Sequence, residues 1–372
     1  MIAQRFGFTR PFLRKWNNRV YFRLKKRSCG FKNQVRARQS GETWGLIVAG
    51  LLFAVTAQGA ETEQPQSSVL APLATRSLLL DAAISGEAIV AVGERGHVLR
   101  SVDQGNSWKQ ITVPTRATLT AVAFRPDGFG FAVGHDATIL RTLDGGRSWQ
   151  RVYHEPEQER PLLDTYILSP QHAIAVGAYG FYLESHDGGS NWDLRDLIAT
   201  DFGESATPDD GEESYPDDYH LNYFAVSGTG SWYMAAEAGI IYRSRDMGVN
   251  WLRLPSPYAG SFMGTLPLPE DRVLVFGLQG KLFYSNDDGE GWQQMDSGAQ
   301  ATFTSALVLR DGRVLVTGYA GSVLTASRDL SEIRLTQLRR RMGISAAIQL
   351  PGGDLLFFGS GGMLRMPLNN LK

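Results

Sequence analysis

Residues 133–149 read VGHDATILRTLDGGRSW, and this stretch is the pattern from which the fold of the chain is predicted. Near-copies of it recur between about residues 70 and 366 of the 372-residue chain. Aligned on Gly134, the equivalent positions are Gly93, Gly134, Gly177, Ala236, Gly277, Gly318 and Gly359, at spacings of 41, 43, 59, 41, 41 and 41 residues. A repeat of about 41 residues is typical of propellers and solenoids.

Each copy has the internal pattern of four short strands separated by glycine-rich turns. In the second copy, apolar strand-like segments cover 119–124, 129–133 and 138–142, and Trp149 begins a fourth. Turns fall at 126–128, 134–137 and 144–146. Four strands per repeat match one blade of a β-propeller, and no helical period competes with this interpretation.

The first, innermost strand of each copy is expected at 78–84, 119–124, 162–168, 221–226, 261–266, 303–309 and 344–350. Seven inner strands predict seven blades. The chain ends soon after the third strand of the last blade, so 68–73 is expected to supply the missing strand. The fold class is therefore all-β, a seven-bladed β-propeller closed by N- and C-terminal strands that share one blade. Its parts are a leader at 1–60, a linker and ring-closing strand at 61–77, and the propeller at 78–372.

A box of the form Ser/Thr-x-Asp-x-Gly-x-x-Trp occupies the third turn of five copies. Its Asp and Trp residues are Asp103 and Trp108, Asp144 and Trp149, Asp187 and Trp192, Asp246 and Trp251, and Asp287 and Trp292. We interpret them as structural, because Asp and Ser/Thr bond turn amides and Trp buries a large ring beside the next blade. The sixth copy keeps Ser327 and Asp329 but lacks the Gly and Trp, which predicts a looser outer edge there.

The N-terminal 60 residues have the order of a secretory signal peptide, with a basic region, an apolar run at 44–55 and small residues. We expect cleavage between Ala57 and Ala60 and a periplasmic product; the alternative is an anchor through uncleaved 44–60. Residues 1–60 hold twelve of the 37 basic and one of the 38 acidic residues, so their removal leaves a net charge of about −12. That charge argues against nucleic-acid binding.

The box motifs, together with the Gly-x-x-Gly turn and the Leu-Arg-Ser/Thr run of 99–101 and 140–142, resemble the photosystem II stability/assembly factor family. The resemblance covers about 70–366 and implies a non-enzymatic, seven-bladed propeller that binds membrane-protein partners during assembly. Similar exported propellers occur in bacteria without a photosystem, some encoded beside resistance-nodulation-division exporters. The resemblance therefore implies an accessory role for an envelope membrane protein complex, with such an exporter as the expected partner.

The same box occurs in sialidases, so a carbohydrate-active enzyme that uses the channel mouth is the alternative function. The nearest match to the sialidase arginine strand, Phe124-Arg125-Pro126, lacks the Ile and precedes a turn. No Ser-His-Asp set, phosphate loop or nucleotide fingerprint is present. The six histidines are scattered without the close spacing of a zinc site. We therefore expect no catalytic residues, no cofactor and no metal.

Function is expected where the copies differ, because recognition on a repetitive scaffold falls to variable turns. The second turn of each blade opens on the face that carries the links between blades, at the channel mouth. The candidate partner-binding residues there are Glu94, Arg95, His135, Asp136, Tyr179, Glu237, Gln279 and Tyr319. The alternative is that these turns vary only because a turn tolerates many residue types, with no role in binding.

The 59-residue spacing locates an acidic insertion at 193–220, expected to overhang the same mouth. Its candidate partner-binding residues are Phe202, Asp209, Asp210, Glu212, Glu213, Tyr215 and Tyr219. It is either a solvated loop or a docking element, and it lacks the ligand order of an EF-hand calcium loop. Arginines recur at the end of the third strand as Arg100, Arg141 and Arg243. We interpret these as inter-blade hydrogen-bond donors to a neighbouring Asp, the alternative being a basic stripe for an anionic partner.

Overall fold

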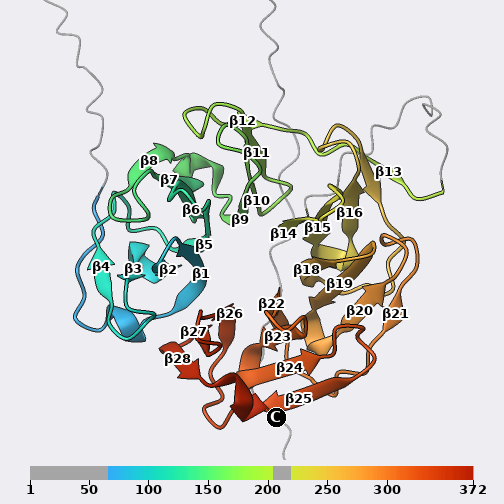
Figure 1. The fold of residues 1–372 in the computed structure, drawn as a ribbon. Coiled ribbons are helices and arrows are strands. Elements are labelled where there is room, and N and C mark those ends of the chain that lie inside the picture. The colour runs from blue at the N-terminus through green and yellow to red at the C-terminus, as the bar shows by residue number, and fades with distance from the viewer. Residues whose placement is uncertain (1–65, 204–218, 372) are drawn as a thin grey trace, which may run out of the picture. The chain divides into compact units, whose positions relative to one another are not determined.

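The computed structural model describes residues 66–203 and 219–371, all within the compact unit 62–372. The predicted all-β, seven-bladed propeller is confirmed: seven sheets are arranged in a ring around a central channel (Figure 1). The only helices in the described part of the chain are short 3-10 segments, none of them long and apolar enough to cross a membrane.

The seven blades follow one another in chain order, and in each the first strand is innermost. The first three blades are β1 (Leu79–Ser85), β2 (Ala88–Gly93), β3 (Val98–Ser101) and β4 (Lys109–Ile111); β5 (Leu119–Phe124), β6 (Gly130–Gly134), β7 (Thr138–Thr142) and β8 (Gln150–Tyr153); and β9 (Leu162–Ile167), β10 (Ala173–Gly177), β11 (Tyr182–Ser185) and β12 (Asp193–Leu194). The fourth is β14 (Leu221–Val226), β15 (Trp232–Ala236), β16 (Ile241–Ser244) and β17 (Trp251–Arg253). The last three are β18 (Phe262–Leu268), β19 (Arg272–Gly277), β20 (Leu282–Ser285) and β21 (Gln293–Gln294); β22 (Phe303–Val308), β23 (Val314–Gly318), β24 (Ser322–Ala326) and β25 (Ile333–Gln337); and β26 (Ile344–Gln349), β27 (Leu355–Gly359) and β28 (Gly362–Met366). The observed inner strands agree with the predicted ones to within two residues at either end.

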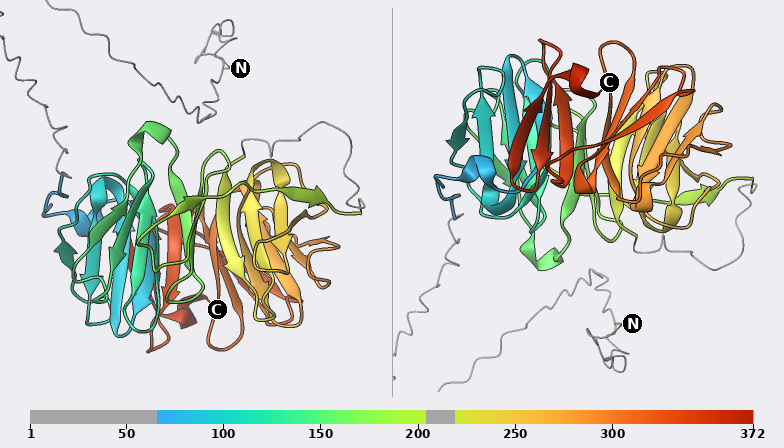
Figure 2. Two further views of the ribbon diagram at one scale, coloured as in Figure 1. Left: turned by 90° about the horizontal axis from the view of Figure 1, so that it is seen from above. Right: turned by 90° about the horizontal axis from the view of Figure 1, so that it is seen from below.

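The second strand of each blade is buried along almost its whole length, as in β2, where all six residues are buried. Both faces of these strands are covered by neighbouring blades, which is why their sequences read as continuous apolar runs rather than alternating ones. Seven buried apolar clusters each lie between two adjacent blades. The hydrophobic core is therefore a ring of blade-to-blade interfaces, and edge-on views show strands running between two faces (Figure 2).

The predicted sharing of one blade by the two termini is not confirmed. In the described residues, the last sheet has three strands, β26, β27 and β28. Ser68 instead bonds to the outer edge of the first blade, where its N–H donates to the Val113 carbonyl at 2.8 Å. The first and last blades meet through side chains, since Leu79 and Ile89 share a buried cluster with Ile348 and Phe358.

The expectation of a loose outer edge on the sixth blade is wrong. Strand β25 makes five residue pairs with β24, whereas β12 and β21 make two each with their neighbours. Leu330 adopts the left-handed backbone at φ 63°, as Gln104 and Met247 do at the same box position, and its side chain is buried in the core. The sixth turn therefore contributes a buried apolar side chain although the box Gly and Trp are missing.

The start of the insertion lies at the outer edge of the fourth blade, not over the channel. Strand β13 (Ala199–Asp201) pairs in parallel with β17, which makes this a five-stranded sheet. The N–H of Phe202 then donates to the Arg253 carbonyl at 3.0 Å. The expected overhang is therefore wrong for this part of the insertion.

Candidate functional site

The five complete box turns are held by their own side chains. In the second blade, the Thr142 hydroxyl donates to Asp144 Oδ1 at 2.8 Å, and the same carboxylate oxygen accepts the N–H of Ser148 at 2.9 Å. In the first blade, hydrogen bonds from the Ser107 side chain and backbone and from Ser101 lower the pKa of Asp103 to about 2. These carboxylates are committed to the turn, which explains why the box repeats.

The box tryptophans pack toward the preceding blade, whereas the sequence analysis expected the next one. The ring of Trp108 in the first blade meets Phe358 of the seventh edge-on, with centroids 6.0 Å apart. Trp192 in the third blade meets Phe131 of the second at 5.3 Å. Box residues therefore join blades as well as closing turns.

The recurrent arginines form hydrogen bonds between blades, as expected. Each of them donates to a backbone carbonyl of the neighbouring blade, whereas an Asp side chain was expected as the acceptor. Arg100 donates to the Gly145 carbonyl at 2.8 Å and Arg141 to the Gly188 carbonyl at 3.0 Å. In both cases the acceptor lies in the box turn of the following blade. These arginines are used inside the scaffold.

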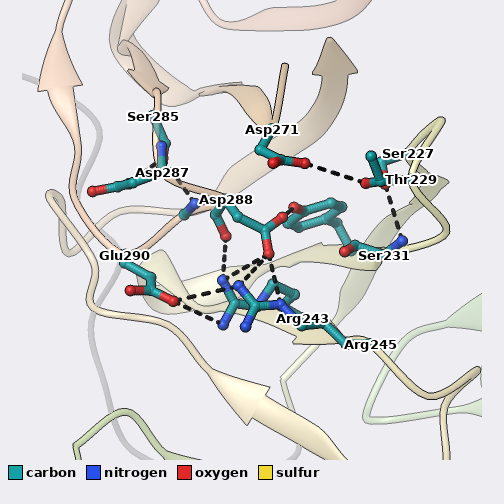
Figure 3. A network of polar contacts seen from close by, with 12 residues as sticks. Ser227, Thr229, Ser231, Arg243, Arg245, Asp271, Ser285, Asp287, Asp288 and Glu290 are labelled. Atoms are coloured by element: carbon teal, nitrogen blue, oxygen red, sulfur yellow. Dashed lines mark hydrogen bonds and ion pairs between the residues drawn. The ribbon is translucent and has the colours of Figure 1, made fainter. Parts of the chain in front are cut away.

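Between the fourth and fifth blades the arginine joins a larger charged network (Figure 3). Arg243, with a side chain 4% exposed, donates to the Asp288 carbonyl at 2.5 Å and lies 3.1 Å from its carboxylate. Arg245 donates to the same carboxylate at 2.5 Å, and the Tyr233 hydroxyl donates to it as well. Burial and this hydrogen bond raise the pKa of Tyr233. The network stabilises one interface of the ring.

The second turns and the links between blades form one face of the ring, here called the link-side face. Two of its candidate residues support the scaffold: Glu94 accepts the N–H of Leu78 and Glu237 that of His220, each at 3.2 Å. The exposed candidates on this face are Arg95, His135, Asp136, Tyr179, Gln279 and Tyr319. The available recognition surface is thus smaller than the sequence suggested.

Three of the candidates lie together where the third and fourth blades meet. The Tyr179 ring contacts the His220 ring edge-on at 4.8 Å, and His220 Nδ1 lies 3.3 Å from Glu237 Oε1. The carbonyl of Tyr219 accepts the N–H of Gly180 at 2.9 Å. An exposed aromatic group therefore stands on the link-side face, whereas Tyr319, 52% exposed, lies separately on the sixth blade.

The candidate residues of the acidic insertion fall into two groups, one at the outer edge of the fourth blade and one outside the described residues. Phe202 is 42% exposed beside β17, away from the link-side turns. Asp209, Asp210, Glu212, Glu213 and Tyr215 lie outside the described residues.

An exposed run of arginines on the link-side face was missed by the sequence analysis. Arg339, Arg340 and Arg341 lie in the link between the sixth and seventh blades, next to the second turns of both. Leu338 N–H donates to the Gly321 carbonyl, and Arg340 Nη2 to the Gly361 carbonyl, each at 2.9 Å. Three consecutive basic residues between two strand patterns were the available signal. They give this face a local positive charge.

The channel holds a cavity of about 470 Å³ lined by the inner strands. Burial raises the pKa of Asp81 to about 7 and that of Asp164 to about 8. Each carboxylate accepts a backbone N–H from the next blade, Asp81 from Val122 and Asp164 from Phe224, both at 2.8 Å. These aspartates therefore join neighbouring blades around the channel.

Neutral side chains of other blades also form hydrogen bonds to the next blade around the channel. Thr120 donates to the Leu162 carbonyl at 2.7 Å and Asn222 to the Phe262 carbonyl at 2.8 Å. The sialidase-like string does not contribute to the channel wall, since Arg125 pairs with Asp127 at 3.4 Å in a hairpin turn.

The expectation that all histidines stay scattered is wrong for two of them. His172 and His186 lie on either side of Glu184, on the third blade. The register of β10 and β11 explains this, because Ala173 pairs with Ser185 and so places the flanking residues together. The spacing of Glu184 and His186 by two residues was the only local signal.

With this geometry established, comparison with known proteins gives a consistent result. A family model described as photosynthesis system II assembly factor YCF48 matches residues 102–161. A solved propeller described as YCF48 bound to D1 peptide has a TM-score of 0.63 at 17% identity, covering 81% of this chain and 95% of its own. YCF48 from Cyanidioschyzon merolae has a TM-score of 0.62 at 19% identity, covering 82% and 99%. The chain is therefore a propeller that is similar to the YCF48 assembly factors, with residues 102–161 matching their family model.

Other proteins that this propeller resembles are less similar in sequence or match over a shorter stretch. The uncharacterized protein YkuO of Bacillus subtilis (strain 168) is 43% identical over 44 residues, which span 12% of this chain and 15% of that protein. A streptogramin B lyase has a TM-score of 0.62 at 13% identity, covering 81% of this chain and 96% of its own. An ancestral GH74 enzyme reaches 0.63 at 14%, covering 82% and 47%. The solved structures are all less than 20% identical to this chain, so they show the fold alone. The same fold occurs in binding proteins and in enzymes.

Proposed function

We propose that this chain is an exported, non-catalytic binding module that helps to assemble a membrane protein complex of the cell envelope. The observation that supports it is the likeness, over 81% of the chain, to a propeller described as bound to a D1 peptide. By analogy, the partner presents an extended segment to the propeller. A resistance-nodulation-division exporter is the partner class that we propose to test first.

The surface that we assign to this segment is the link-side face. It offers exposed aromatic rings at Tyr179 and Tyr319 and exposed guanidinium groups at Arg340 and Arg341. Aromatic and arginine side chains are the types most often responsible for binding energy in protein interfaces. We therefore propose a partner segment with apolar side chains and carboxylates.

Export is part of the proposal and rests on residues outside the described structure. The basic leader, the apolar run at 44–55 and the small residues that follow predict cleavage between Ala57 and Ala60 and a periplasmic product. N-terminal sequencing of the protein from fractionated cells checks this. A cytoplasmic product that begins at Met1 would contradict it.

Affinity capture from detergent-solubilised membranes tests the function. We expect the wild-type chain to enrich one membrane protein complex, and a Tyr179→Ala/Tyr319→Ala double variant to recover much less of it. Leu143→Ala, which changes a side chain 69% exposed next to a box turn, is the matched control and should recover the wild-type amount. Equal recovery by all three proteins, or no membrane protein at all, would refute the proposal.

The alternative function, a sialidase-like or other carbohydrate-active enzyme, predicts catalysis at the channel mouth. Against it, the channel carboxylates Asp81 and Asp164 are engaged by backbone N–H groups of the next blade. Assays with fluorogenic sialosides and other glycosides distinguish the two. Turnover that disappears when one residue of the channel mouth is changed would establish the enzyme instead.

A further inference from the structure

A compact group of metal-ligand side chains lies on the third blade, on the side of the ring opposite the link-side face. His172 precedes β10, Glu184 belongs to β11 and His186 follows it. His172 Nε2 lies 2.6 Å and His186 Nε2 3.4 Å from Glu184 Oε1, and the three ligand atoms fall within 4.8 Å of one another. Nothing in the proposed partner binding uses them.

We propose that His172, Glu184 and His186 bind a divalent transition-metal ion such as Zn²⁺. With bonds of about 2.0–2.1 Å in a tetrahedral site, ligand atoms lie about 3.3–3.4 Å apart. The His186–Glu184 distance of 3.4 Å already meets this requirement. The His172–Glu184 distance must open by less than 1 Å, which a small rotation of either side chain supplies. Two imidazoles, one carboxylate and an open fourth position form a ligand set that zinc proteins use.

The surroundings orient the ligands. Arg195 Nε donates to the other carboxylate oxygen, Glu184 Oε2, at 2.7 Å, which leaves Oε1 facing the histidines. The His172 ring lies against Trp232, with centroids 5.9 Å apart. Such outer contacts hold metal ligands in position and strengthen binding.

Arg195 also determines which cation fits. Its guanidinium offsets the charge of Glu184, so the two neutral imidazoles must supply much of the attraction. Calcium and magnesium need several oxygen ligands, whereas imidazole favours zinc, copper and nickel. The site is therefore expected to discriminate against Ca²⁺ and Mg²⁺.

His172, Glu184 and His186 all line a cavity of about 530 Å³ at the junction with the fourth blade. Met247 and Val249, 69% and 77% exposed, stand at its rim in the next box turn. A water molecule or a small ligand has room there. The metal ion would thus sit at the solvent boundary, accessible to exchange.

Cobalt titration of the purified, chelator-treated protein without a polyhistidine tag tests the site. We expect one equivalent of Co²⁺ to bind with visible absorption bands, to be displaced by Zn²⁺, and to resist an excess of Ca²⁺ or Mg²⁺. His186→Ala and Glu184→Gln should each weaken binding more than about tenfold. The His186 side chain is 54% exposed, so its removal should leave folding intact.

The matched control is His135→Ala, which removes an exposed histidine from the link-side face and should bind Co²⁺ like the wild type. The absence of saturable binding in the wild type, or unchanged binding in His186→Ala, would show that the three side chains only hydrogen-bond to one another. Loss of metal binding without loss of partner capture would separate this site from the proposed function.

Discussion

Replacing Arg243 by alanine tests whether buried charge holds the fourth and fifth blades together. The substitution removes a guanidinium that is 4% exposed and leaves the Asp288 carboxylate, 11% exposed, with one cation fewer. Breaking a buried ion pair costs about 3–5 kcal/mol. We expect the lower end, about 3 kcal/mol, because Arg245 still donates to Asp288 at 2.5 Å.

Arg141→Ala is the matched control, since it removes the equivalent arginine from the second blade. There the acceptors are the Gly188 carbonyl and the Ser190 hydroxyl, which water reaches after the substitution. A loss of about 1 kcal/mol is expected. Urea unfolding of both variants, with the slope of the transition checked against the wild type, measures the difference. Equal losses would refute the account of the network in Figure 3.

Two further predictions concern carboxylates in the scaffold. Asp144→Ala removes the acceptor for several turn hydrogen bonds, and we expect it to cost about 1 kcal/mol, seen as a lower Tm with an unchanged fold. Because the pKa values of Asp81 and Asp164 are raised in the folded state, these two carboxyl groups ionise at a lower pH in the unfolded chain. The free energy of unfolding should therefore fall as pH rises from about 4 towards 8. The fall is at most about 1.4 kcal/mol per pH unit for each group. An Asp81→Asn/Asp164→Asn variant should lose this decline in thermal melts, and a decline that persists would assign it elsewhere.

The repeat in the sequence predicts blade number and strand positions well, because both depend on local patterns. A Gly such as Gly134 is needed where a side chain would meet the Thr118 carbonyl, since an added Cβ would lie 2.1 Å from it. The same close contact with a carbonyl recurs in six of the seven copies, the fourth having Ala236 at this position, so it is visible in the amino-acid order. Such local requirements locate the inner strands without knowledge of the ring.

Features that depend on contacts between distant segments were not predictable in this way. The sequence shows two box residues missing from the sixth blade, but not that Leu330 is buried in the core or that β25 pairs with β24 over five residues. It gives no register between β10 and β11, so the meeting of His172 with Glu184 was missed. The course of β13 along the fourth blade depends likewise on an outer edge available for pairing.

The exposure of the candidate binding residues was predicted in part. Variation among copies identified Tyr179 and Tyr319, which are exposed on the link-side face. It also selected Glu94 and Glu237, whose carboxylates accept backbone N–H groups within their own blades. Variation alone does not separate side chains that face solvent from those that brace a turn.

Site-specific photo-crosslinking in intact cells tests the central claim, that the link-side face binds a membrane protein partner. A photoreactive amino acid at Tyr179 is compared with the same group at Leu143, two exposed positions on opposite faces of the ring. The account predicts a discrete crosslink to a membrane protein from position 179 and none from position 143. The same crosslink from both positions, or from 143 alone, would contradict it.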